Sequence, residues 1–272
     1  MKLLAILVGA RGTPACLDAA ALAARSLPYA TIEALHVTVD PEHMIAASEE
    51  IELQRLRARD EGSAEQRAQA AHTAFTTWSA GAGDDACDVE WKDMTGSEEE
   101  TVCREAAAAD VIVLVLAREA NLDAADALHA ALFRSCKPVL VVPPDWRGGV
   151  RPAFTHIAVG LSDSEAARHA IEGAGPWLRA ARRVTAIRIG ERDDAALGLA
   201  RLLSEAGAQP ELHVVPRRGS DLGAQIVAEA KAVGADMLVT GAYRHSQIVE
   251  WLLGGTTRHM LAVADLPLLL AH

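Results

Sequence analysis

Two short passages of this chain are near-copies of two later ones, and this internal repeat limits the folds that the chain can adopt. Ala108–Val113 reads Ala-Ala-Asp-Val-Ile-Val, and Gly234–Val239 reads Gly-Ala-Asp-Met-Leu-Val. Lys137–Val141 (Lys-Pro-Val-Leu-Val) is matched in the same way by Leu266–Leu270 (Leu-Pro-Leu-Leu-Leu). The chain has 272 residues, which is enough for two ordinary domains. The repeat therefore predicts two copies of one unit.

Each copy alternates apolar strands with segments of helical spacing. The first copy has expected strands at 3–8, 31–39, 87–94, 111–116 and 138–142, and expected helices at 15–27, 41–80, 97–108 and 122–133. The second has expected strands at 156–161, 183–189, 211–215, 237–240 and 267–270, and expected helices at 164–180, 194–206, 221–233 and 255–263. We expect Ser97 and Glu100 to form a capping box at the start of the third helix. The 41–80 segment predicts one long charged helix, either a partner-binding arm or a cover for the sheet edge.

This order predicts an α/β fold with two tandem doubly wound domains, each a five-stranded parallel sheet with helices on both faces. The passage Pro143–Gly149 has the composition of a linker. We therefore place the domains at residues 1–145 and 151–272. Ligands of such sheets bind beyond the carboxyl ends of the strands, where the strand order reverses.

Charge and cysteine usage exclude several classes of protein. The formal net charge is −11, which argues against a general nucleic-acid binder and against adhesion to an anionic membrane. The four cysteines form no Cys-x-x-Cys pair, so we expect free thiols in a reducing compartment and no metal. The apolar run over residues 1–10 is interpreted as a buried first strand rather than a signal peptide, because a similar run recurs at Ile157–Leu161.

A glycine-rich passage near the end of the chain predicts a phosphate site. The strand ending at Thr240 and Gly241 leads into a polar loop, and Gly254-Gly255-Thr256-Thr257 then opens a helix. Glycines let the backbone approach an anion, and the N–H groups of a helix N-terminus are donors at the positive end of its dipole. We call Gly241 and Gly254–Thr257, with the loop between them, the phosphate cradle. If the cradle is functional, the protein binds a nucleotide; if it is degenerate, the protein is a scaffold of the same fold.

The pattern resembles the universal stress protein family in its tandem bacterial form. The family's hallmark is a glycine, two residues, a glycine, nine residues, then Gly followed by Gly, Ser or Thr; here it reads Gly241, Arg244, Gly254, Gly255. The resemblance implies a cytoplasmic stress-response protein of a family in which many members bind ATP, with or without Mg²⁺, and others do not. It also implies a homodimer, because members usually dimerise through their last strands, and in tandem members the two halves resemble that dimer within one chain. The net charge predicts no nucleic-acid or membrane partner, and protein partners are unspecified.

Three departures from the family pattern bear on binding. The second glycine of the hallmark is Arg244 here, and the family's acidic residue after the first strand falls at Ser162 in the second half and at Arg11 in the first. Arg244 either closes the phosphate site or supplies a guanidinium fork to the phosphate. The matching first-half loop, 117–121, lacks glycine. We therefore expect one nucleotide site, in the second half, and a structural first half.

Several side chains near the cradle have a second interpretation. His245 and His259 either contact phosphate or are solvated or capping residues, and we favour the second. Tyr243 either stacks on a base or covers the sheet end. The expected nucleotide-binding residues are Gly160, Leu161, Ser162, Ile189, Thr240, Gly241, Tyr243, Arg244, His245, Gly254, Gly255, Thr256 and Thr257.

No catalytic residue is expected, because the chain has no Gly-x-Ser-x-Gly elbow, no His-Glu-x-x-His motif and no Walker A ending. We therefore expect a regulatory stress protein that binds an adenine nucleotide and hydrolyses it slowly at most. The alternative is a nucleotide-free interaction scaffold of the same fold.

Overall fold

The structure is a computed structural model that describes residues 1–39, 57–59, 61–82, 88–116, 127–148, 152–191, 194–242 and 255–272. Its contacts divide the chain into two compact units. The first contains Met1–Lys137 and Val142–Gly149, and the second contains Pro138–Val141 and Val150–His272. Among the described helices, none is long and apolar enough to cross a membrane.

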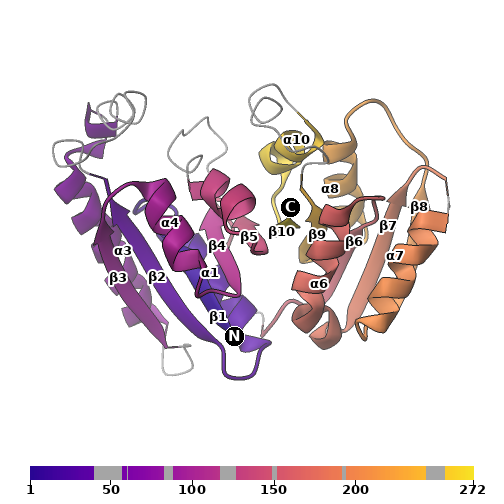
Figure 1. Ribbon diagram of the computed structural model, residues 1–272, viewed down its shortest axis with the longest axis horizontal. Coiled ribbons are helices and arrows are strands. Elements are labelled where there is room, and N and C mark those ends of the chain that lie inside the picture. Colours follow the sequence, from indigo (N-terminus) through magenta and orange to yellow (C-terminus); the bar gives the residue numbers. More distant parts are fainter. Residues whose placement is uncertain are drawn as a thin grey trace. The chain divides into compact units, whose positions relative to one another are not determined.

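The first unit is a parallel sheet with strand order β3-β2-β1-β4 (Figure 1). Helices α1 and α3 cover one face of the sheet, and α4 covers the other. The elements are β1 (Lys2–Ile6), α1 (Thr13–Arg25), β2 (Thr31–Thr38), α3 (Ala64–Gly81), β3 (Val89–Thr95), α4 (Glu98–Ala106), β4 (Val111–Val115) and a π-helical turn η1 (Ala130–Arg134).

The second unit repeats this architecture with strand order β10-β9-β6-β7-β8. Helices α6 and α7 lie on one face of its sheet, and α8 and α10 lie on the other. The elements are β6 (His156–Gly160), α6 (Glu165–Ala180), β7 (Arg183–Ile189), α7 (Asp194–Glu205), β8 (Pro210–Val215), α8 (Leu222–Ala232), β9 (Met237–Gly241), α10 (Thr256–Val263) and β10 (Leu268–Ala271).

Strand β5 (Val139–Val142) departs from the expected all-parallel sheets. Leu140 pairs with Leu269 and Val141 with Leu268, and this pairing with β10 is antiparallel. The segment Pro138–Val141 therefore belongs by its contacts to the second unit, although it comes from the first copy of the repeat. A sequence repeat shows where a strand begins and ends but does not show which neighbour it pairs with.

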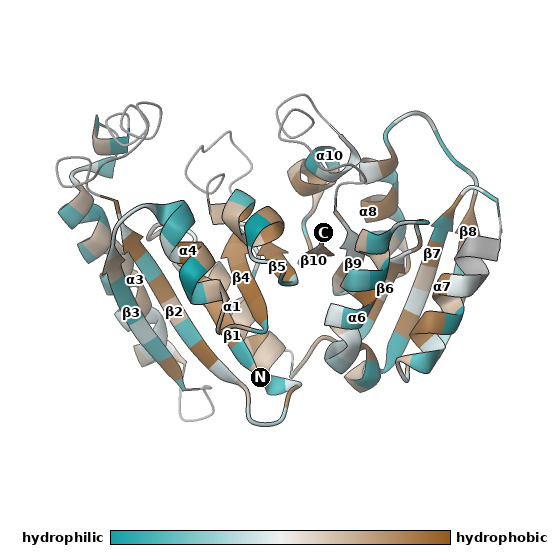
Figure 2. Cartoon of the chain, viewed as in Figure 1, coloured by the Kyte–Doolittle hydropathy of each residue, from teal (hydrophilic) through white to brown (hydrophobic). Residues whose placement is uncertain are grey.

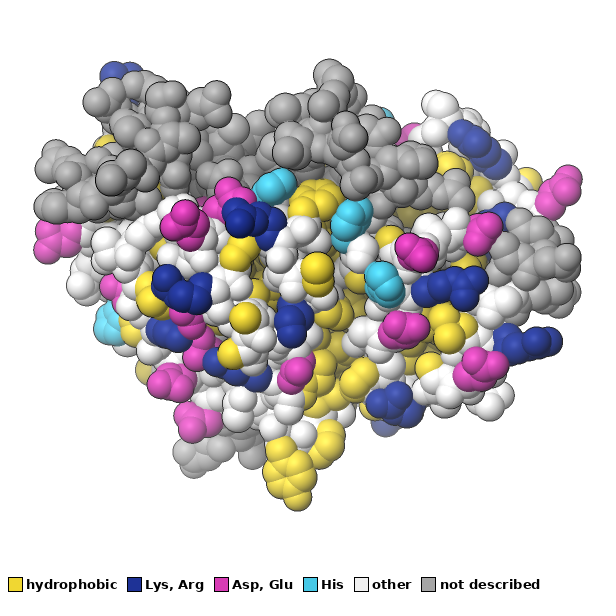
Figure 3. Space-filling view, viewed as in Figure 1, with side chains coloured by type: hydrophobic (Ala, Val, Ile, Leu, Met, Phe, Trp, Pro, Cys, Tyr) yellow, Lys and Arg dark blue, Asp and Glu magenta, His cyan; other side chains and the backbone are white. Residues whose placement is uncertain are grey.

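The cores follow from the strand sequences. Strand β6 is buried along its whole length, and β4 and β9 are nearly so, because helices cover both faces of a parallel sheet. The edge strands β3 and β8 are largely exposed or half-buried, and Figure 2 shows hydrophilic residues along β3. On the face drawn in Figure 3, acidic and basic side chains are interspersed, so the described residues there form no surface of one charge.

An aspartate at the start of β4 and of β9 explains one of the two repeated passages. Asp236 accepts hydrogen bonds from Thr155 N (2.8 Å), Thr155 Oγ1 (2.9 Å) and His156 N (3.1 Å). In the first unit, Asp110 accepts a hydrogen bond from Lys2 N at 2.8 Å. The carboxylate in each unit binds backbone N–H at the beginning of the first strand and so fixes the two central strands in register.

The expected helix over residues 41–80 is wrong as a single element. Residues 57–59 and 61 are helical, but the helix ends at Gly62, whose φ is +89°. Ser63 then caps α3: its hydroxyl accepts from Gln66 N at 3.2 Å, and Gln66 Oε1 accepts from Ser63 N at 2.9 Å. Residues 40–56 and 60 lie outside the described residues, so a role as an arm stays a prediction.

The capping box expected at Ser97 is also absent. Ser97 is the N-cap of α4, but its side chain makes no capping hydrogen bond among the described residues. Glu98, Glu99 and Glu100 still place three carboxylates in the first turn, where the helix dipole favours them. The Ser-x-x-Gln pattern at Ser63 was the true capping signal, and it was hidden inside a segment of continuous helical spacing.

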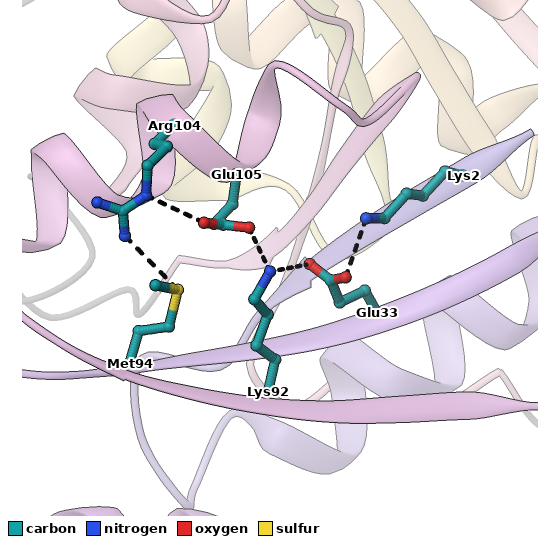
Figure 4. A network of polar contacts seen from close by, with 6 residues as sticks. All are labelled: Lys2, Glu33, Lys92, Met94, Arg104 and Glu105. Carbon is teal, nitrogen blue, oxygen red and sulfur yellow. Dashed lines mark hydrogen bonds and ion pairs between the residues drawn. The ribbon is translucent and has the colours of Figure 1, made fainter.

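Ion pairs connect helix α4 to the sheet of the first unit (Figure 4). The Lys92 ammonium lies 3.5 Å from Glu33 Oε1 and also pairs with Glu105 of α4, while Lys2 Nζ lies 2.9 Å from Glu33 Oε2. Arg104 Nε lies 3.1 Å from Glu105 Oε1. The hydrogen bond to Glu105 raises the pKa of Lys92, and the same contact lowers the pKa of the Glu105 carboxyl. The network therefore stays charged at neutral pH.

Replacing Asp236 by Ala is expected to destabilise the second unit. The change leaves two backbone N–H groups and a hydroxyl without their charged acceptor, and hydrogen bonds to charged groups contribute about 1.5 to 3 kcal/mol each. We expect a loss of about 3 kcal/mol, measured by equilibrium urea unfolding. Asp265→Ala, which breaks an ion pair between two half-exposed side chains, is the control and is expected to cost under about 0.5 kcal/mol. Equal losses in both variants would contradict this role of Asp236.

Candidate functional site

The carboxyl ends of β6 and β9 lie side by side where the strand order of the second unit reverses. A Cβ atom on Gly160 would lie 3.1 Å from Thr240 Oγ1 and 3.5 Å from Ile226 of α8. Leu161 N donates to Ile187 O at 2.8 Å, which continues the ladder one step beyond β6. Ile189 ends β7 two residues further on. The predicted residues of these strand ends therefore meet around one edge of the sheet.

Helix α8 connects this edge to the N-terminus of α10. Gly223, in the first turn of α8, packs so closely on α10 that a Cβ atom there would lie 2.1 Å from Thr256 O and 2.8 Å from Met260 N. Ile226, which approaches Gly160, follows three residues later, about 4.5 Å along the helix axis. The start of α10 and the end of β6 are thus both held against the first turns of α8.

Among the described residues, no side chain caps the N-terminus of α10. Gly255 is the N-cap, with φ −126° and ψ 176°. A Cβ atom on Gly255 would meet no described atom within 4 Å. Thr256 is exposed and Thr257 is buried. Such a helix end presents N–H donors and the positive end of a dipole to an anion.

His259 contacts the neighbouring helix. Its Nδ1 lies 3.2 Å from Asp221 Oδ2, and Asp221 Oδ1 accepts from Ala224 N at 2.9 Å as the N-cap of α8. This contact ties the two helix N-termini together and matches the capping interpretation more closely than a phosphate contact. The predicted residues Tyr243, Arg244, His245 and Gly254 lie outside the described residues.

The loop after β6 is held by hydroxyl groups. Ser162 Oγ and Ser164 Oγ are 3.1 Å apart, and Ser164 N donates to Ser162 O at 2.9 Å. Ser164 also caps α6, because its Oγ accepts from Ala167 N at 3.2 Å. The half-buried Ser162 therefore presents a hydroxyl to the edge of the sheet where the family pattern has a carboxylate.

Arg188 is a residue of this edge that the sequence analysis missed. Its Nη1 donates to Leu161 O at 3.3 Å and its Nε donates to Glu191 O at 3.2 Å. The guanidinium therefore contacts the carbonyl group of the residue that directly precedes Ser162. Its position directly before Ile189, at the end of a predicted strand, was the signal that could have revealed it.

Gly241 has a structural reason that the sequence did not show. A Cβ atom there would lie 2.5 Å from Ala167 N and 2.7 Å from the carbonyl carbon of Ala166, both backbone atoms of the first turn of α6. Only glycine lets the end of β9 approach this helix so closely. Gly241 is required by packing, whether or not the unit binds an anion.

The first unit fills the matching edge with its own side chains. Because Leu7 N donates to Leu35 O as Leu161 N does to Ile187 O, Val8 rather than Arg11 corresponds to Ser162. Arg57, which is 9% exposed, donates from Nη2 to Val8 O at 3.2 Å. Gly160, Thr240 and Gly241 correspond by the same register to Ile6, Leu114 and Val115.

His36 completes the edge of the first unit. Its Nδ1 donates to Leu7 O at 2.7 Å, and its ring stacks on Trp91 with centroids 6.0 Å apart. Burial lowers the pKa of His36, and the charges of Arg57 and Arg67 lower it further, while the Leu7 hydrogen bond and Asp93 oppose the change. The imidazole is therefore neutral at pH 7.

Two adjoining hollows in the first unit were not predicted. One of about 710 Å³ lies along α3 beside Pro14, and one of about 300 Å³ includes Asp18 and Arg25. Trp78 lines both hollows, and its Nε1 donates to Asp18 Oδ1 at 2.8 Å.

The described residues contain no cluster of His, Cys, Asp and Glu suited to a metal ion. Cys16, Cys103 and Cys136 are free thiols, and burial raises the pKa of Cys16 far above its usual range.

Comparison with known proteins identifies the fold and the second domain. Residues 181–272 match the sequence profile of the universal stress protein family. The part of the second unit from residue 181 to residue 272 therefore has the sequence of a universal stress protein domain. A search of curated protein sequences finds no match.

Solved structures extend the similarity to the whole chain. A universal stress protein from Archaeoglobus fulgidus is 14% identical with a TM-score of 0.62, and the match covers 99% of this chain and 95% of that chain. A putative universal stress protein from Pseudomonas aeruginosa is 15% identical with a TM-score of 0.51, covering 99% and 92%. A universal stress protein in complex with cAMP is 26% identical over 44% of this chain and 97% of that chain, with a TM-score of 0.38. At these identities, the two matches that span the chain show a shared tandem fold.

Two glycine substitutions in the universal stress protein domain are expected to behave differently. Gly241→Ala forces a methyl group into the backbone of α6 and is expected to cost roughly 2 kcal/mol of unfolding free energy. Gly255→Ala enters open space at an ordinary φ and is expected to change stability by under about 0.5 kcal/mol. Urea unfolding of the two variants checks this pair, and a silent Gly241→Ala would show that the close approach to α6 does not constrain the domain.

Stability of the first unit is expected to fall as the pH falls from 7.5 to 5.5. The pKa of His36 is lower in the folded chain than the ordinary value of about 6.5, so the unfolded chain binds the proton more readily. The stabilisation is complete above the ordinary pKa and is lost on acidification towards the folded pKa. In the His36→Gln variant, the drop in the urea midpoint from pH 7.5 to pH 5.5 is expected to be smaller than in the wild type. An equal drop in both chains would contradict the assignment to His36.

Proposed function

We propose that this chain is a regulatory stress-response protein whose second domain binds an adenine nucleotide, with ATP the first candidate. The observation that carries the proposal is the N-terminus of α10, which no described side chain caps and which Gly223 of α8 holds beside the carboxyl end of β6. A phosphate at Gly255–Thr257 would receive backbone N–H donors. The sugar and base would then extend along the edge formed by Gly160, Ser162 and Ile189.

The proposal assigns one nucleotide to each chain. In the first unit, Ile6 and Leu114 stand where the second has Gly160 and Thr240, and Arg57 already binds the carbonyl at the end of the first strand. A ligand there would have to displace buried apolar and cationic side chains. The first domain serves in this view as a structural partner of the second.

Hydrolysis of the nucleotide is proposed to be slow and incidental. Of the two histidines of the cradle, His259 is engaged with Asp221, which also caps α8. A general base must reach the attacking water, and this contact directs the imidazole to another helix. We further propose a cytoplasmic protein that forms homodimers, with Mg²⁺ entering only as a partner of the nucleotide phosphates.

An interaction scaffold that binds no nucleotide is the second candidate. One observation favours it: Gly241, the first glycine of the family pattern, is required by the packing of β9 on α6. A fold can therefore keep this glycine after the loss of the ligand. The two candidates differ in whether a nucleotide stabilises the native chain.

Thermal unfolding with and without millimolar Mg-ATP tests the proposal. A ligand that binds only the native state stabilises it by about 2.7 kcal/mol at 100 times its Kd, so the midpoint is expected to rise. Arg244→Gly shows whether the arginine helps or closes the site. No rise in the wild type but a rise in this variant would mean that Arg244 closes it.

Gly255→Asp is the matched control. Aspartate is a good N-cap and fits the open space, so the variant is expected to fold with unchanged stability. Its carboxylate would occupy the N–H donors of α10 and repel phosphate, which removes the ATP-induced rise. A rise of equal size in Gly255→Asp would mean that ATP binds elsewhere, and no rise in any of the three chains would favour the scaffold.

A further inference from the structure

The edge of the second unit carries polar and cationic groups at the positions where the first unit carries apolar and neutral ones. Because the ladders match at Leu7 and Leu161, Ser162 replaces Val8 and Arg188 replaces His36. His36 and Arg188 donate to equivalent carbonyls of their own units, His36 to Leu7 O at 2.7 Å and Arg188 to Leu161 O at 3.3 Å. Arg188 therefore keeps the structural contact and adds a permanent positive charge.

The location of Arg188 in the fold indicates which kind of ligand its charge could bind. In doubly wound sheets that bind dinucleotides, an acidic side chain near the end of the second strand accepts the ribose hydroxyl, whereas an arginine there accommodates a phosphate on the ribose. Arg188 lies at the end of β7, the second strand of its unit, and Ser162 stands at the end of β6, the strand beside it. Neither residue provides the carboxylate that a free ribose diol prefers.

Two further features favour an anion at this place. The N-terminus of α6 begins two residues after Ser162, and the Ser162 and Ser164 hydroxyls, 3.1 Å apart, include donors. The nearby carboxylates of Asp163, Glu165 and Glu191 belong to exposed residues, where solvent screens them. Arg188 is half-buried, and its Nε and Nη1 each donate to a backbone carbonyl. These two contacts fix the position of the guanidinium.

We propose that the second domain prefers an adenine nucleotide that carries a phosphate on the 2′ or 3′ oxygen of the ribose, with Arg188 as the residue that determines this specificity. The inference rests on the proposed nucleotide site. The ribose phosphate lies at Arg188, Ser162 and Ser164, and the 5′-phosphate lies at the N-terminus of α10.

Calorimetric titration of the full chain tests the preference. AMP is compared with adenosine 2′,5′-bisphosphate and adenosine 3′,5′-bisphosphate, which add one phosphate to the ribose, and with the 3′,5′-cyclic phosphate. We expect at least one of the bisphosphates to bind 10-fold or more tightly than AMP. The two bisphosphates distinguish the 2′ from the 3′ position, and the cyclic compound shows whether a diester suffices.

Substitutions assign the preference to its residue. Arg188→Gln is expected to reduce the ratio of AMP to bisphosphate dissociation constants to within about twofold of unity, and Arg188→Lys to give an intermediate ratio, since it keeps the charge but loses the fork. Ser162→Asp is expected to reverse the preference towards AMP. Arg183→Gln, at the far end of β7 in an ion pair with Glu211, is the matched control and is expected to leave the ratio unchanged. Thermal midpoints verify that each variant folds.

The failures of the two proposals are distinguishable. If ATP and AMP bind but neither bisphosphate binds more tightly, this inference is overturned and the nucleotide site stands. Equal weakening of all ligands by Arg188→Gln also overturns it, because the arginine would then act only through the loop. If no adenine compound binds the wild-type chain, both proposals fail.

Discussion

The contact between an aspartate carboxylate and the beginning of the first strand sets the geometry of each unit. Asp110 and Asp236 lie at the start of the fourth strand of their copies and bind backbone N–H of Lys2 and His156. The contact fixes the two central strands against each other at their amino ends. Parallel strands of similar length that start in register also end in register, so the carboxyl ends that form the site meet at one level. The candidate site of the second unit thus depends on a buried carboxylate at the opposite end of the sheet.

Sequence reasoning predicted most elements to within a few residues, because helices cover the central parallel strands on both faces and these strands read as continuous apolar runs. It failed where local chemistry interrupts a continuous pattern. Glutamate, arginine and alanine carry helical spacing through Gly62 and Ser63, yet the positive φ of Gly62 ends one helix and the Ser63 hydroxyl begins the next. The antiparallel pairing of β5 with β10 follows from the family resemblance but not from the strand patterns themselves, since pairing between distant segments is a tertiary property.

The residues of the candidate site also fall into those that the topology predicts and those whose roles depend on tertiary contacts. Strand-end residues such as Gly160 and Thr240 follow from the topology and could be named in advance. Gly223 could not, because its role depends on which helix lies opposite it. Arg188 could have been named from its place before Ile189, but its contact with the carbonyl of Leu161 is visible only in the structure. Gly241 has a second reason that the sequence did not reveal: the contact with α6 requires glycine there, whether or not an anion binds. The placement of Tyr243, Arg244, His245 and Gly254 stays a prediction.

The antiparallel pairing of β5 with β10 has a consequence for any attempt to divide the protein. Cleavage in the linker between residues 145 and 151 would separate Pro138–Val141 from the unit whose sheet this segment completes. The isolated C-terminal fragment would then expose β10, a short strand of four buried residues, as an open sheet edge. Open apolar edges pair with other chains, and a tract as hydrophobic as Leu-Leu-Leu-Ala invites self-association. A cut in the linker therefore does not coincide with the boundary between the two units of the fold.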